Sequence, residues 1–362
     1  MTGDESVNRR NLLLGTGAMF GAGLVLKQRP AHAQGTTITG AGATFPAPIY
    51  QKWGELAKQP TGITLNYQAI GSGGGLNQIT NRTVDFGASD APVAADQLAA
   101  RKLLQFPTVM GGIVPIVNLP GIQAGQLKLT PEVLADIFLG KITRWNDAKL
   151  VEMNRGVDLP RTAIAVVHRA DASGTSFVFT SYLAKISSEW KEKVGASTSV
   201  AWPTGTGARG NDGVAATVKN TRGGIGYVES AYATQNQLTT TQLRNRAGNF
   251  VTPEMASFRA AASSADWASA QNFAVELIDT SGAQAWPILS PTFILLPTNP
   301  AEAEKSRAVM QFFDWAFKSG DEAASALQYI PLPDEVAQRV RQAWAREVKG
   351  PDGKAVWTSS AG

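Results

Sequence analysis

The sequence predicts an α/β fold whose chain passes from a first lobe into a second and then back again. Short apolar runs alternate with amphipathic stretches of about 10–15 residues, a pattern typical of strands followed by helices. Two longer apolar stretches, 109–117 and 287–296, are interpreted as extended strands that cross between the lobes. The length of 362 residues fits two domains at roughly 150 residues each.

The remaining elements are predicted from the spacing of apolar residues. Three short apolar runs are predicted strands, and the amphipathic stretch after each is a predicted helix: strands 38–40, 63–70 and 84–88, and helices 46–58, 74–81 and 94–104. Three further helices are predicted over 177–186, 301–318 and 334–348. The Trp and Phe residues of the last two helices are expected to be core, and the sequence contains no internal repeat.

Residues 1–33 are expected to be an export signal rather than part of the fold. Two arginines, Arg9 and Arg10, precede an apolar, glycine-rich stretch over 12–26, and Ala31-His32-Ala33 fits a cleavage site. The apolar stretch is too short to span a bilayer of about 30 Å. The arginine pair resembles a twin-arginine signal, and an ordinary secretory leader is the alternative. Either signal predicts a soluble protein exported to the periplasm.

The composition excludes several classes of site. The chain has no Cys, which excludes disulfides, thiolate metal sites and Cys nucleophiles. It has two His residues, His32 and His168, so a His-rich metal site is also excluded. After the expected leader, 29 Lys and Arg stand against 27 Asp and Glu, which gives no concentrated basic character for binding nucleic acid. We therefore expect no metal, no cofactor and no nucleic acid.

Three segments share one design, in which a strand end leads through small residues and a hydroxyl into a helix. They are G-A-G-A-T-F-P at 40–46, G-S-G-G-G at 71–75 and D-A-S-G-T-S at 171–176. The start of a helix offers unpaired N–H groups and a partial positive charge, which attract anions. Each segment alone is more simply an ordinary N-cap and turn. Three together indicate an oxyanion site.

Three charged residues close to these segments fit such a site. Arg169 presents a planar fork of donors suited to bidentate capture of an oxyanion. Asp171 could hold that fork in place, or it could cap the helix at Ser173. Asp90 would repel an anion unless it accepts a hydrogen bond from a protonated ligand oxygen, which phosphate has near neutral pH and sulfate lacks. Taken singly, Arg169 could be a surface residue and Asp90 an N-cap.

Longer motifs extend these segments: T-G-A-G-A-T-F-P-A-P at 39–48, V-D-F-G-A-S-D-A-P at 84–92 and R-A-D-A-S-G-T-S-F at 169–177. They resemble the signature segments of periplasmic phosphate-binding proteins, the substrate-binding components of the high-affinity phosphate ABC importer. The resemblance extends over nearly the whole chain after the leader, including 211–213, 224–229 and 312–316. It implies a two-lobed, venus-flytrap fold that binds one dehydrated phosphate between the lobes.

The resemblance also implies the lobes and the site residues. By position, lobe I comprises 34–110 plus 291–362, and lobe II comprises 111–290. The implied phosphate contacts are Thr44, Phe45 through its N–H, Ser72 and Asp90 from lobe I, and Arg169, Ser173, Gly174 through its N–H and Thr175 from lobe II, with Asp171 beside Arg169. One departure is Gly73, where relatives often carry a second serine.

The sequence therefore predicts a monomeric periplasmic receptor that binds inorganic phosphate and delivers it to the permease subunits of an ABC transporter. No catalytic residue is expected. A secreted phosphate-ester hydrolase remains an alternative because it too needs an oxyanion pocket, although such enzymes usually rely on metals or a His or Cys nucleophile. A receptor for arsenate or sulfate is a second alternative, since the same donors fit any tetrahedral oxyanion.

Overall fold

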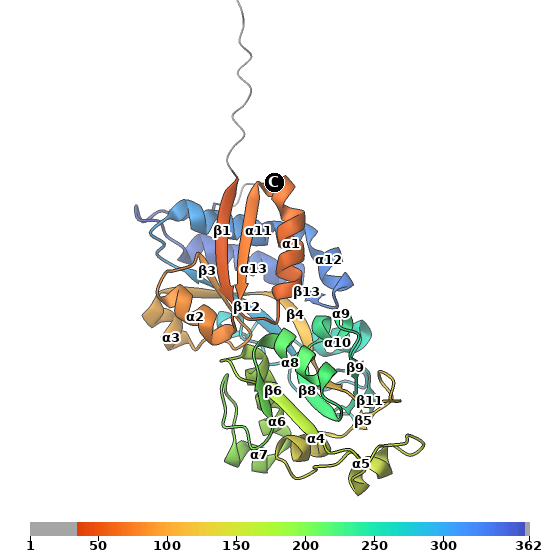
Figure 1. Ribbon diagram of the computed structural model, residues 1–362. Helices are drawn as coiled ribbons and strands as arrows, with labels where there is room; N and C mark the ends of the chain where they lie inside the picture. The colour runs from red at the N-terminus through yellow and green to blue at the C-terminus, as the bar shows by residue number, and fades with distance from the viewer. Residues whose placement is uncertain (1–34, 359–362) are drawn as a thin grey trace, which may run out of the picture. The chain divides into compact units, whose positions relative to one another are not determined.

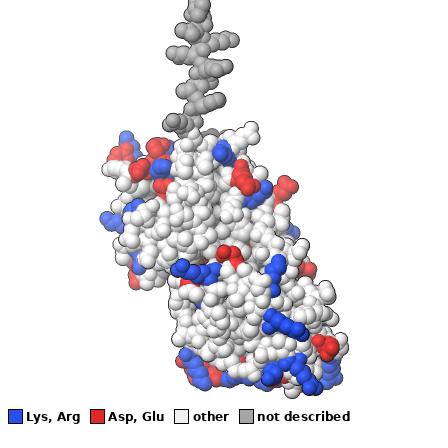
Figure 2. Space-filling model, in the orientation of Figure 1, with Lys and Arg blue, Asp and Glu red and all other residues white. Residues whose placement is uncertain are grey.

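The computed structural model describes residues 35–358, and the predicted export signal lies outside them. Strands and helices alternate along the described chain, so the α/β prediction is confirmed (Figure 1). Among the described helices, none is both long enough and apolar enough to cross a membrane. On the face drawn in Figure 2, acidic and basic side chains are interspersed and form no large patch of one sign.

A mixed sheet organises the described residues in the strand order β2-β1-β3-β12-β4-β8-β6-β7. At one end, β1 (Thr36–Gly42) lies between the parallel strands β2 (Ile63–Ala69) and β3 (Phe86–Ser89). At the other end, β6 (Ala165–Arg169) lies between the parallel strands β7 (Thr206–Ala208) and β8 (Gly224–Glu229). We call these ends the β1–β3 side and the β6–β8 side.

Two long strands join the two sides. The antiparallel pair β4 (Leu103–Val117) and β12 (Leu289–Pro297) extends over 103–112 of β4, and residues 113–117 of β4 pair instead with β8. Every residue of both strands is buried, which explains their nearly continuous apolar sequence. They correspond to the two extended strands predicted at 109–117 and 287–296, and β4 passes directly from one side into the other.

One predicted helix extended wrongly into the strand that follows it. The helix expected over 94–104 ends earlier, as α3 (Ala95–Arg101), because Lys102 adopts a left-handed φ of 51°. Leu103 and Leu104 then begin β4 and pair with β12. Two adjacent leucines fit the end of an amphipathic helix and the start of a buried strand equally well, so apolar spacing alone could not separate the two.

Helices and smaller strands complete the fold. Those near the β1–β3 side are α1 (Ala47–Thr61), α2 (Ser72–Thr80), α11 (Ala303–Ser319), α12 (Asp321–Ala326), β13 (Ile330–Pro331) and α13 (Asp334–Glu347). The intervening segments form β5 (Lys128–Leu129), α4 (Pro131–Phe138), α5 (Ala148–Met153), α6 (Gly174–Ile186), α7 (Ser188–Lys193), α8 (Gly210–Asn220), α9 (Ser230–Gln235), β9 (Thr239–Thr240), β10 (Gln242–Arg244), β11 (Phe250–Val251), α10 (Met255–Ala262) and a short 3-10 turn at Gln271–Phe273.

Aromatic side chains fill the core on both sides of the sheet. Phe313 of α11 packs edge-on against Phe106 of β4, with ring centroids 5.7 Å apart, and Trp344 of α13 packs on Phe106 at 5.1 Å. All three are fully buried, whereas Trp315 and Phe317 of α11 are only partly buried against the core. On the β6–β8 side, Phe179 stacks on Tyr227 at 4.1 Å. Such contacts fix the strand ends from which the polar segments emerge.

Candidate functional site

The three predicted strand-to-helix segments meet at one place between the two sides of the sheet. Thr44 lies between β1 and α1, and Ser72 begins α2 after Gly71, whose φ of 89° favours glycine. Gly174 begins α6, and its N–H donates to the Ser72 hydroxyl at 3.0 Å. A Cβ at position 174 would lie 2.5 Å from that hydroxyl and 2.7 Å from Asp90, so only glycine allows this approach.

The residues predicted for the site are almost inaccessible to solvent. The exposed fraction is at most 3% for Thr44, Phe45, Ser72, Asp90, Arg169, Ser173 and Thr175. The side chain of Asp171 is 10% exposed. Because a buried polar group without a partner costs about 1–3 kcal/mol, the partners of each group define what the site can accept.

The four hydroxyls of the site follow one pattern. Each accepts at least one hydrogen bond from an N–H group: Thr44 from Asn211, Ser72 from Asp90 and Gly174, Ser173 from Ser176, and Thr175 from Asn211. A hydroxyl that already accepts keeps its own proton available to donate. The four hydroxyls can therefore act together as donors toward a ligand that presents bare oxygens.

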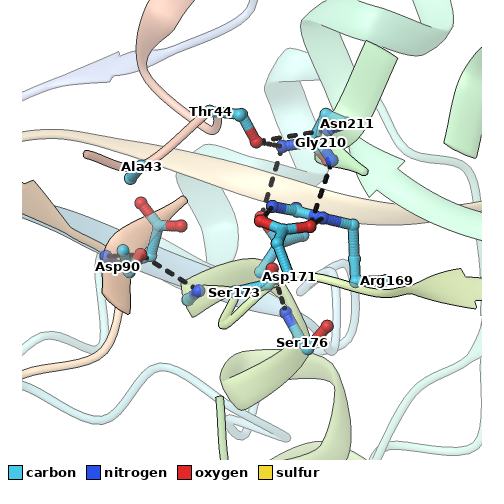
Figure 3. A network of polar contacts seen from close by, with 12 residues as sticks. Ala43, Thr44, Asp90, Arg169, Asp171, Ser173, Ser176, Gly210 and Asn211 are labelled. Atoms are coloured by element: carbon cyan, nitrogen blue, oxygen red, sulfur yellow. Dashed lines mark hydrogen bonds and ion pairs between the residues drawn. The ribbon is translucent and has the colours of Figure 1, made fainter. Parts of the chain in front are cut away.

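Arg169 is held by Asp171 along one edge of its guanidinium group (Figure 3). Nε donates to Oδ1 at 2.7 Å and Nη2 to Oδ2 at 2.5 Å, while the Gly210 N–H donates to Oδ1 at 3.1 Å. Burial alone would raise the pKa of Asp171, but the hydrogen bonds and charge of Arg169 outweigh it and leave the pKa below its ordinary value. The other terminal nitrogen, Nη1, is buried and has no partner within residues 35–358.

Asp90 supplies a buried acceptor. Its Oδ1 accepts a hydrogen bond from the Thr292 hydroxyl of β12 at 2.8 Å, whereas Oδ2 has no partner in the described part of the chain. Burial raises the pKa of Asp90 to about 7, and the Thr292 hydrogen bond and the charge of Arg169 offset this only in part. Arg169 Nη1 and Asp90 Oδ2 are thus a buried donor and a buried acceptor without partners among the residues that the structure describes. A ligand that satisfies both must accept a hydrogen bond from Nη1 and donate one to Oδ2.

Three tyrosines bind the backbone of the segment that carries Thr44 and Phe45. Their phenols donate to three consecutive carbonyl oxygens: Tyr67 to Ala43 at 2.6 Å, Tyr232 to Thr44 at 2.5 Å and Tyr329 to Phe45 at 2.7 Å. Burial raises the pKa of each phenol, so all three stay protonated donors. In a trans peptide the C=O and N–H point in opposite directions, so anchoring the Ala43 and Thr44 carbonyls directs the next two N–H groups away from the phenols.

The structure thus brings all the predicted residues together and adds five that sequence reasoning missed. Asn211, Thr292 and the three tyrosines touch site residues from distant parts of the chain. Asn211 stands in one of the family-like motifs, which gave it no role. The others had no local pattern to mark them, because their importance arises only from contacts across 24 to 284 positions.

Two cavities border the site. One, of about 270 Å³, is lined by Thr44, Asp171 and Arg209, and another, of about 300 Å³, is lined by Ser72 and Ser89. A larger cavity of about 590 Å³ lies elsewhere, beside Trp315 and Trp357, and shares no residue with the site. Cavity volume alone would therefore indicate a different part of the molecule. The candidate site is located instead by the buried polar groups that converge there.

Comparisons with known proteins agree with the predicted family. The model of the PBP superfamily domain matches residues 28–319. The phosphate-binding protein PstS of Pasteurella multocida is 55% identical over 324 residues, covering 90% of this chain and 94% of the relative. PstS of Haemophilus influenzae is 51% identical over 317 residues, covering 88% and 95%.

A solved structure shares the fold. It is a high-affinity periplasmic phosphate-binding protein, PfluDING, bound with phosphate; it is 24% identical, with a TM-score of 0.69 over 85% of this chain and 94% of that one. The predicted periplasmic-binding-protein fold is thereby confirmed. With a family model that matches most of its length and relatives more than half identical to it, this chain belongs to the PBP superfamily and, within it, to the family of the phosphate-binding proteins PstS.

Proposed function

We propose that this chain binds one inorganic phosphate ion between the β1–β3 side and the β6–β8 side. The observation that carries the proposal is a pair of buried, unpartnered atoms, the donor Arg169 Nη1 and the acceptor Asp90 Oδ2. They lie within one cluster with four hydroxyls that can donate. Monohydrogen phosphate matches this set, since its bare oxygens accept and its protonated oxygen donates.

The proposed contacts are those expected from the sequence. Thr44, Ser72, Ser173 and Thr175 donate through their hydroxyls, Phe45 through its N–H and Arg169 through its guanidinium, while Asp90 accepts and Asp171 orients Arg169. The N–H of Gly174 is also proposed to donate to phosphate, for which it must turn from the Ser72 hydroxyl that it meets in this structure. Hydrogen bonds to a charged ligand contribute about 1.5–3 kcal/mol each before the entropic cost of binding is subtracted. Several of them in a water-excluding site support high affinity.

The division into two lobes gives a mechanism of capture. We assign residues 34–110 and 291–362 to lobe I and 111–290 to lobe II, joined through β4 and β12. A ligand that touches both lobes stabilises the closed arrangement, which alone offers all of the contacts. Small-angle scattering should show a smaller radius of gyration when phosphate is added, and an unchanged profile at saturation would indicate a rigid site.

The family supports a proposal for the role in the cell. One solved structure that shares the fold is described as a putative phosphate ABC transporter substrate-binding protein from Clostridium perfringens, with bound phosphate. We infer that this chain acts in the periplasm and hands phosphate to an ABC permease, without catalysing a reaction. A hydrolase would need a base, and His168 is the histidine within the described residues. Its ring stacks on Trp202 at 4.8 Å, and its Nδ1 is engaged by the Arg169 carbonyl oxygen at 3.1 Å.

Calorimetry on the ligand-stripped chain tests the proposal. At pH 8, phosphate should bind with one ion per chain, arsenate should bind as a close isostere, and sulfate should give no measurable heat. Absence of phosphate binding would overturn the proposal. Turnover of p-nitrophenyl phosphate, measured on the same preparation, would instead support the hydrolase alternative.

A further inference from the structure

We propose that Asn211 is a positioning residue that fixes the direction of the hydrogen bonds made by Thr44 and Thr175. The inference rests on the proposed function, because it concerns how those two hydroxyls meet phosphate. Asn211 lies in the first turn of α8 and is fully buried. Figure 3 shows it beside Thr44, above the ion pair of Arg169 and Asp171.

The hydrogen bonds of Asn211 settle which way its amide faces. The backbone N–H of Glu229 donates to Asn211 Oδ1 at 3.0 Å, so the oxygen must point toward β8. The NH₂ group therefore points the other way, where Nδ2 lies 2.8 Å from Thr44 Oγ1 and 3.3 Å from Thr175 Oγ1. The backbone N–H of Asn211 also donates to Thr44 Oγ1, at 3.2 Å.

These hydrogen bonds leave Thr44 able to act toward a ligand only as a donor. Its oxygen accepts two N–H groups, so its own proton is the part left for a ligand. Thr175 likewise accepts from the amide, so its single proton is left to donate, to Asp90 when no ligand is bound and to phosphate when it is. Without the Asn211 amide, Thr44 keeps only the backbone N–H of residue 211 and Thr175 loses its donor, so both hydroxyls gain freedom to turn a lone pair toward the bound anion. One amide therefore sets donors on both sides of the site.

Two substitutions separate this role from a structural one. Asn211→Asp keeps an oxygen for the Glu229 N–H but places a second oxygen before the hydroxyls, which would then donate to it rather than to phosphate. Calorimetry should show phosphate affinity falling at least 100-fold. Asn211→Ala removes the amide but keeps the backbone N–H that donates to Thr44, so it only loosens the two hydroxyls and should reduce affinity about tenfold, in line with one weakened hydrogen bond to a charged ligand. Asn220→Asp, the same change at the exposed far end of α8, is the matched control and should leave affinity unchanged.

The decisive readout is the dependence on Thr44. In a Thr44→Ser background, which keeps the hydroxyl, Asn211→Ala should again cost about tenfold. In a Thr44→Val background it should cost less than about threefold, because the hydroxyl with the shorter hydrogen bond to Asn211 is gone and Thr175 alone remains for Asn211 to act through. An equal cost in both backgrounds would overturn the proposal and assign Asn211 a role in folding alone, as would an Asn211→Asp protein that melts normally and binds phosphate like the parent. A parent chain that binds no phosphate would instead remove the proposed function, and this inference with it.

Discussion

The two halves of the site are built in opposite ways. On the β6–β8 side, residues 169–175 form one continuous segment whose parts support each other: Asp171 holds Arg169, and Ser173 caps the helix that Gly174 begins. On the β1–β3 side, Thr44, Ser72 and Asp90 come from three separate segments. Each of these three is held by a residue from elsewhere in the chain.

The chemistry divides along the same line. The β6–β8 half holds the guanidinium and so attracts any oxyanion, while the β1–β3 half holds the buried acceptor that only a protonated ligand satisfies. A local segment can supply charge by itself, because an ion pair two residues apart needs little help from the fold. An acceptor that must repel the wrong ligand has to be buried and fixed, and this takes contacts across the whole chain.

Removal of Arg169 should produce the largest effect. Arg169→Met deletes the cation of the site and leaves Asp171 partly buried without its partner, so phosphate affinity should fall at least 1,000-fold and the free energy of unfolding by about 3 kcal/mol. Calorimetry and urea denaturation measure the two losses. The double variant Arg169→Met with Asp171→Asn should regain stability but not binding. If the double variant also binds phosphate, the charge is supplied elsewhere.

The raised pKa of Asp90, in the β1–β3 half of the site, predicts that the free energy of unfolding depends on pH. The folded chain holds a proton on Asp90 up to about pH 7, whereas the unfolded chain releases it near the ordinary value of 3.8. Between those limits the folded state binds more protons, so the contribution of Asp90 to stability falls as pH rises, by about 4 kcal/mol in total. Asp90→Asn replaces the carboxyl with an amide that does not titrate, so the variant does not lose this stability as pH rises.

The matched measurement is urea denaturation of ligand-free parent and Asp90→Asn proteins from pH 4 to pH 8. The variant should gain relative to the parent as pH rises, and the gain should level off above pH 7. The difference between the two proteins removes most of the titration of Glu229, whose pKa is raised chiefly by burial and further by the charge of Asp90. A difference that stays constant across this range would show that Asp90 titrates normally.

The two halves also differ in how far the sequence could predict them. The Arg169–Asp171 pair and the Ser173 cap lie within a few residues of each other, so these hydrogen bonds could be anticipated from residue types and spacing. The contacts of this segment with Ser72, Gly210 and Asn211 could not be. Thr292, Tyr232 and Tyr329 could not be anticipated either, since a lone Thr on a buried strand, a Tyr within a short helix and a Tyr after a helix have no distinguishing pattern. The strands and helices followed from apolar periodicity, and the error at 103–104 arose where periodicity is ambiguous. Long-range contacts are decided by packing, which no local pattern contains.

The choice between phosphate and sulfate tests the β1–β3 half of the site, which holds Asp90. In Asp90→Asn, the carboxylate that repels sulfate becomes an amide that can donate to it, so sulfate affinity should rise by about 100-fold, a change of about 2.7 kcal/mol. Phosphate affinity should fall by much less, because the other donors remain. Competition titrations with both ions decide the matter. Continued exclusion of sulfate would mean that Asp90 is not the filter, and Asp171 would be tested next.

The smallest effects are expected from Tyr67 and Tyr232, whose phenols donate to the neighbouring carbonyls of Ala43 and Thr44. They compare a contact within one half of the site with a contact between the two halves. Tyr67 of β2 donates to the Ala43 carbonyl within the β1–β3 side, so its bond should survive a parting of the proposed lobes. Tyr232 of α9, assigned to the other lobe, donates to the Thr44 carbonyl. Removing either hydroxyl should cost about 1 kcal/mol, the value of one hydrogen bond. For Tyr67→Phe that loss should appear in thermal stability and leave phosphate affinity within about twofold. For Tyr232→Phe it should appear in phosphate affinity, about fivefold weaker, because a bond made only when the halves meet changes the population of the closed state. Equal affinity losses in the two variants, measured by calorimetry, would show that the Thr44 carbonyl contact does not depend on closure.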